Sequence, residues 1–174
     1  MKRSVRNHNL VVATSCFSGI FKSIQLAAVY CLYYNMDFTK QKVKNYNSIL
    51  TRHNTEANNQ EISVWEIERD ILKSVDFDCE KEAFQFPFRA KMKMAGKKIK
   101  PKDMAVAIQN INDALEVYLI LSVYTLKKNY RFSNDQVKEW WDHVKDFCLL
   151  YAQGMHDEHV IEYFKQECDL VITE

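Results

Sequence analysis

The sequence predicts an all-α protein made of two pseudo-repeats, each a long helix, a second helix and a short helix. The chain of 174 residues contains three glycines and two prolines, too few turn residues for many short strands. Residues 26–46 (LAAVYCLYYNMDFTKQKVKNY) also recur at 120–140 (ILSVYTLKKNYRFSNDQVKEW), with seven of 21 positions identical. About one or two identities would be expected from ordinary composition. The predicted organisation is a first helical repeat over 1–86, a basic connecting insert over 87–102 and a second repeat over 103–174, in one compact unit.

The first repeat begins with a predicted helix over about 9–35, whose apolar residues recur at helical spacing. An Asn-x-x-Phe corner ends at Phe38, and Thr39 is a suitable N-cap because its hydroxyl can accept a free backbone amide. The second helix is predicted to end near Asn58. Ser63 and Glu66 then have capping-box spacing and start a short third helix with Ile67 and Ile71 facing inward, among others.

The second repeat follows the same order. Pro101 suits the first turn of a fourth helix that runs to about Lys128. Ser133 repeats the Thr39 cap and opens a fifth helix with a continuous apolar stripe that includes Trp140. Gly154 suits a left-handed C-terminal cap, and a sixth helix is predicted over about 157–168.

Composition favours a folded protein in a reducing compartment. Hydrophobic residues make up 47% of the chain, which excludes a disordered protein. The five cysteines include no CxxC pair, so we expect reduced thiols in a cytosol, with Cys31 and Cys148 as core residues. The apolar tract 10–34 contains Lys22 and Gln25, which favours a buried helix over a membrane span.

The strongest functional signal is the basic insert between two acidic stretches. Nine acids lie within 56–82 and nine within 139–174, whereas 89–102 has seven bases and no acid. Such a segment can neutralise phosphates of a nucleic acid, match acidic surfaces of its own or another molecule, or simply be solvated. The candidate binding residues are Arg89, Lys91, Lys93, Lys97, Lys98, Lys100 and Lys102.

Two further groups of residues have a functional and a structural interpretation. Trp140 aligns with Tyr46 and is predicted to lie in the core. Trp141 aligns with Asn47 and is the better candidate for a partner-facing aromatic, so it joins the candidate binding residues. The sequence His156-Asp157-Glu158-His159 resembles a metal or catalytic cluster, but the repeat aligns His156 with the Ser63 cap. We therefore expect no catalytic residue, no metal and no cofactor.

Three stretches carry a resemblance to a known type of protein: FPFRAKMKMAGKKIKP, RFSNDQVKEWWDHVKDFCLLYAQGM and the opening VATSCFSGIFKSIQLAAVYCLYY. The second repeat resembles small accessory proteins of phages and mobile elements in gut Firmicutes, and the whole chain further resembles a type II-A anti-CRISPR family found in such bacteria. The resemblance implies a non-enzymatic cytoplasmic protein of the bacterial host cell, without membrane contact. It would bind the type II CRISPR-associated RNA-guided DNA nuclease, with or without guide RNA or target DNA, and block DNA recognition or cleavage.

Such nucleases hold nucleic acid in cationic channels, which acidic stretches 61–70 and 157–167 could occupy. The net charge of +1 departs from strongly acidic DNA mimics. Two alternatives stay open. One is a phage DNA- or RNA-binding regulator that uses the basic segment 89–102. The other is a helical metal-dependent phosphohydrolase centred on His156 and Asp157.

Overall fold

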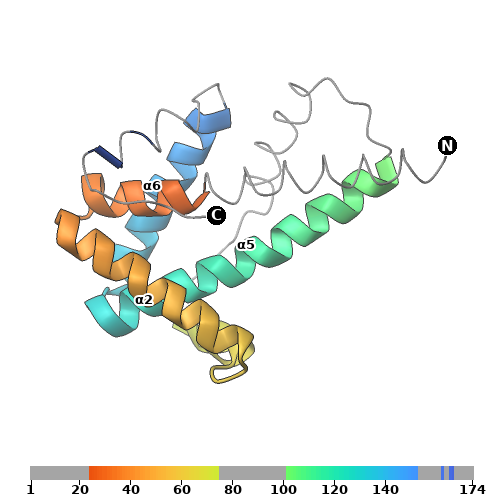
Figure 1. Cartoon of the computed structure of the whole chain (residues 1–174), viewed down its shortest axis with the longest axis horizontal. Helices are drawn as coiled ribbons and strands as arrows, with labels where there is room; N and C mark the ends of the chain where they lie inside the picture. The colour runs from red at the N-terminus through yellow and green to blue at the C-terminus, as the bar shows by residue number, and fades with distance from the viewer. Residues whose placement is uncertain (1–23, 75–100, 153–161, 163–164, 167–174) are drawn as a thin grey trace.

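The computed structural model describes residues 24–74, 101–152, 162, 165 and 166 (Figure 1). The secondary structure of these residues is helical, with short connections and no strand, as the sequence predicts. Residues 24–35 form a helical segment that ends where expected, before the first corner. It is followed by α2 (Lys40–Asn58), α3 (Val64–Ser74), α5 (Pro101–Tyr130) and α6 (Asn134–Ala152).

The centre of the fold is α5, the longest described helix, which runs diagonally across Figure 1 and packs against α2, α3 and α6. From Tyr118 to Leu126 every side chain is buried except that of Tyr124, which is half-buried. A helix that is apolar on all sides must be covered on all sides. Residues 118–126 of α5 come close to this condition, whereas Val106 and Asp113 nearer its N-terminus are exposed.

The predicted helix starts are confirmed by their capping hydrogen bonds. The hydroxyl of Thr39 accepts the Lys42 amide at 3.2 Å, and that of Ser133 accepts the Gln136 amide at 3.2 Å. The Ser63 hydroxyl accepts the amide of Glu66 at 3.3 Å. Each bond satisfies an amide that the first helical turn leaves without a partner, so the side chain fixes where the helix begins.

The two corners have the same backbone geometry. Asp37 and Arg131, 94 positions apart, both adopt left-handed conformations with φ of 54° and 57°. The next residue, Phe38 or Phe132, donates its amide to a carbonyl six residues earlier, at 3.0 Å and 3.2 Å. A left-handed residue reverses the chain direction at a helix end. Both phenylalanine rings are thereby returned to the core, where they meet edge to face with centroids 5.9 Å apart.

Contacts between helices also recur at the 94-residue spacing. The ring centroids of Tyr30 and Phe147 are 5.0 Å apart, and those of Tyr124 and His53 are 4.9 Å apart. Aligned positions are buried in both segments: Leu26 and Ile120, Val29 and Val123, Leu32 and Leu126, Phe38 and Phe132, Val43 and Val137, Tyr46 and Trp140. The organisation into two complete repeats stays a prediction, with the limits 1–86, 87–102 and 103–174. The sixth helix and the insert lie largely outside the described residues.

Burial in the described part of the chain agrees with two sequence predictions. Trp140 is fully buried, and Cys31 is a buried free thiol. The side chain of Cys148, the Gly154 cap and residues 10–23 of the apolar tract lie outside the described residues. None of the described helices combines the length and the apolar character that crossing a membrane requires.

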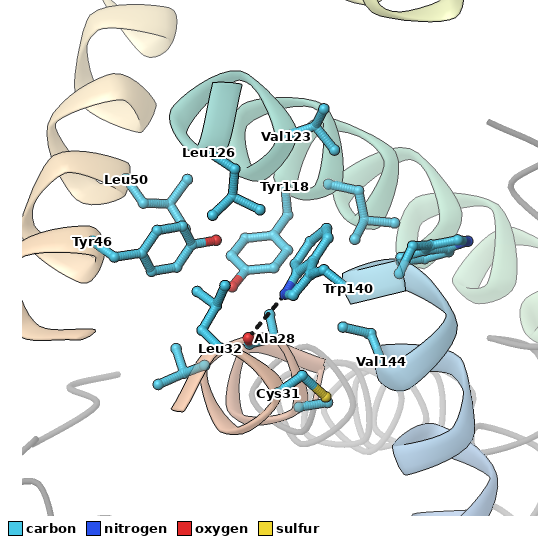
Figure 2. Packing of buried hydrophobic residues seen from close by; sticks show 14 of the residues in the cluster. Ala28, Cys31, Leu32, Tyr46, Leu50, Tyr118, Val123, Leu126, Trp140 and Val144 are labelled. Atoms are coloured by element: carbon cyan, nitrogen blue, oxygen red, sulfur yellow. Dashed lines mark hydrogen bonds between the residues drawn. The ribbon is translucent and has the colours of Figure 1, made fainter. Parts of the chain in front are cut away.

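Tyr46 places a polar hydroxyl in the apolar core. Figure 2 shows its ring reaching from α2 toward Tyr118 of α5. Among the described residues its buried hydroxyl has no hydrogen-bond partner of good geometry. Burial raises the pKa of Tyr46 well above its usual value, and the nearby Ser122 hydroxyl offsets part of that rise.

We expect Tyr46→Phe to leave the free energy of unfolding unchanged or to raise it by about 1 kcal/mol, because a buried hydroxyl without a partner retains its desolvation cost. Urea denaturation followed by circular dichroism measures this. A loss of more than about 1 kcal/mol would show that the hydroxyl is hydrogen-bonded in solution.

Candidate interaction surface

The residues that the sequence predicts for binding are not brought together in the described structure. Arg89, Lys91, Lys93, Lys97, Lys98 and Lys100 lie outside the described residues, so their role in nucleic-acid or partner binding stays a prediction. Lys102 lies in the first turn of α5 and is exposed. Other exposed side chains of the described residues therefore form the candidate interaction surface.

The prediction that Trp141 faces a partner is wrong. Its side chain is only 4% exposed, so it does not present a ring to a partner. Neighbouring residues of a helix point about 100° apart, so a narrow apolar face would bury only one of two consecutive tryptophans. Here α6 buries a wide arc, and the Trp140 and Trp141 rings both enter the interior with centroids 6.2 Å apart.

Trp65 on α3 is the large apolar side chain with the greatest exposure among the described residues, at 65%. One helical turn later, the Arg69 guanidinium lies 5.2 Å from the centre of the Trp65 ring. Its Nε also lies 3.4 Å from a carboxylate oxygen of Asp70. The stacked cation and the ion pair hold the tryptophan and arginine in a shared arrangement at the surface.

The orientation of α3 follows from its sequence. Ile71 is buried and Ile67 is half-buried, and together they turn this face of the helix toward the core. Trp65 and Arg69 lie on the other side because they are displaced by two residues from that pair. We name the exposed set Glu61, Trp65, Glu66, Arg69 and Asp70 the α3 surface. It carries three acids and one base beside the aromatic ring.

A second acidic surface lies along α6. Asp135, Glu139, Asp142 and Asp146 are exposed and follow one another at intervals of four, three and four residues. With Lys138 and His143 they line a shallow depression of about 360 Å³. Lys145 pairs with Asp142 at 2.8 Å. The helical spacing of these carboxylates can be recognised in the sequence. Their exposure follows only from the structure, in which the opposite face of α6 is buried.

The candidate catalytic cluster at His156–His159 lies outside the described residues. Within the described residues no group of three or more His, Cys, Asp or Glu side chains is arranged to hold a metal ion. Among the described residues, the α3 surface is the best-defined candidate site for contact with a partner.

A scan of protein-family models, a search of curated proteins and a search of solved structures found no match to this chain.

Proposed function

We propose that this chain is a phage-derived inhibitor that binds the RNA-guided DNA nuclease of a type II CRISPR system through its α3 surface. Two kinds of observation support the proposal. The sequence resembles a type II-A anti-CRISPR family in its helical segments and basic insert. The observation that carries the proposal is the exposed Trp65, held under Arg69 and flanked by acids.

The composition of the α3 surface suits a contact with another protein. Tryptophan and arginine are the residue types that most often dominate the binding energy of protein interfaces. Because Arg69 is already stacked on Trp65, less side-chain freedom is lost when a partner covers the pair. The acids Glu61, Glu66 and Asp70 complement a cationic surface, such as the channel in which these nucleases hold nucleic acid.

The inhibitor acts, in this proposal, by occupying such a channel rather than by catalysis. The near-neutral net charge of +1 means that local acidic surfaces, not the overall field, provide the attraction. The stripe along α6 supplies a second acidic surface with four carboxylates. A duplicated helical unit is the proposed scaffold, with the segment 87–102 connecting its two halves.

We expect Trp65→Ala to weaken binding to the guide-loaded nuclease by about 2 kcal/mol or more, roughly 30-fold, since it removes the aromatic centre of the contact. The protein is mixed with guide-loaded type II nucleases from several bacteria. Co-elution on size exclusion identifies the target, titration gives its Kd, and DNA cleavage is measured with and without the protein. The wild-type protein should co-elute with a nuclease and stop its cutting.

The matched control is Val106→Ala, which trims an exposed apolar side chain on α5 and should leave binding unchanged. Both variants must keep the wild-type melting temperature. Absence of co-elution together with unaltered cutting would refute the proposal. If the protein instead binds free DNA or RNA, and charge reversal to Glu at Lys91, Lys93, Lys97 and Lys98 abolishes that binding, the regulator alternative is correct.

A further inference from the structure

A histidine is buried in the contact between α2 and α5. His53 is only 1% exposed, and its Nδ1 lies 2.9 Å from the Oγ1 of Thr125. The Thr125 hydroxyl donates its single hydrogen to the Leu121 carbonyl, 2.7 Å away. It can therefore only accept from the imidazole, so the hydrogen of the neutral ring lies on Nδ1. This hydrogen bond joins α2 to α5.

Protonation of His53 would place a charge where the surroundings do not compensate it. The added hydrogen would lie on Nε2, while Nδ1 would keep its neutral acceptor, Thr125. The groups that act on His53 are Glu56 and Arg52 of α2 and Lys128 of α5, and the Tyr124 ring packs against it. Burial lowers the pKa of His53, and Lys128 and Arg52 add to this, whereas Glu56 opposes them.

The corresponding contact 94 residues along the chain has no imidazole at this place. Phe147 stands at the position of His53, and Cys31 at the position of Thr125. Phe147 packs against Tyr30 much as His53 packs against Tyr124, with centroid distances of 5.0 Å and 4.9 Å. The same steric arrangement is thus built once from apolar side chains and once around an imidazole.

We propose that His53 and Thr125 form a pH-sensitive latch, which holds α2 on α5 while the imidazole is neutral and is loosened by protonation. The direction of the pH dependence follows from the buried environment of His53. An open state exposes His53 to water and restores its ordinary affinity for protons, so the open state binds more protons than the closed one. The stabilisation is complete above the ordinary histidine pKa of 6.5 and is lost as the pH falls below it.

Lowering the pH from about 7.5 to about 5.5 should raise the equilibrium constant for opening of α2 by up to about tenfold. The open state holds one more proton than the closed state over roughly one pH unit below the ordinary histidine pKa, and each such unit changes the constant about tenfold. Hydrogen-exchange mass spectrometry on the full chain, corrected for the intrinsic rate at each pH, measures this. Peptides from α2 should lose protection on acidification, whereas peptides from α6 should keep theirs.

The double variant H53F/T125C copies the apolar contact into the α2–α5 position, and F147H/C31T makes the converse exchange. The first should abolish the selective response of α2, and the second should transfer it to α6. If a variant fails to fold, ¹⁵N NMR of the His53 imidazole in the wild-type protein provides a second test. It should show the hydrogen on Nδ1 and a pKa below 6.5. The latch is refuted if α2 responds equally in H53F/T125C, or if the ring titrates at or above 6.5.

Discussion

Replacement of Trp140 by alanine should lower the free energy of unfolding by about 3–5 kcal/mol, the largest effect expected of a single substitution among the described residues. Trp140 is the largest of the fully buried side chains among the described residues. Figure 2 shows its ring at the centre of the core, with Nε1 donating to the Ala28 carbonyl at 3.1 Å. The substitution would leave a cavity between α6 and the helical segment 24–35 and would remove the hydrogen bond between them.

Chemical denaturation followed by circular dichroism measures this loss without relying on tryptophan fluorescence. The matched control is Trp65→Ala, which removes the same side chain from an exposed position and should change the free energy of unfolding by no more than about 0.5 kcal/mol. Equal losses in the two variants would contradict the burial described for Trp140.

Substitutions at the two corners should be coupled. Phe38→Ala and Phe132→Ala are each expected to cost about 3 kcal/mol, because both rings are buried. Since the rings meet edge to face at a centroid distance of 5.9 Å, the double variant should lose less than the sum of the two. The difference should be about 0.5–1.5 kcal/mol, the range found for aromatic pairs.

The control cycle combines Phe38→Ala with Phe147→Ala. Phe147 packs against Tyr30 rather than against the corner, so these two losses should be additive within about 0.5 kcal/mol. Coupling of the same size in both cycles would mean that the corners do not pack on each other in a specific way. Urea denaturation of the three single variants, the two double variants and the wild type provides both cycles.

Local features of this fold were predictable because they depend on neighbours in the sequence. The capping roles of Thr39, Ser63 and Ser133 follow from a hydroxyl placed three residues before a free amide. The end of α2 at Asn58 and the burial of Trp140 also agree with the prediction. The predictions for 89–100 and 153–161 concern residues that the structure does not describe.

The candidate site was less predictable. The sequence draws attention to the basic insert and to Trp141, whereas the structure buries Trp141 and exposes Trp65 beside Arg69. Spacing alone cannot separate these tryptophans, because each lies next to apolar residues of an amphipathic helix. The difference arises from coverage: α6 is covered over a wide arc, and α3 over a narrow one.

By itself, the sequence determined that the described part of the chain is helical, where several of its helices begin, and that Cys31 and Trp140 are buried. These features depend on hydrogen bonds within three or four residues and on the helical period, which can be recognised without knowing any distant contact. Only the tertiary structure decided that Trp141 is inside, that Trp65 is outside, and that His53 lies against Thr125, 72 residues away. Such contacts depend on which helix faces which, and that is set by the packing of the whole core.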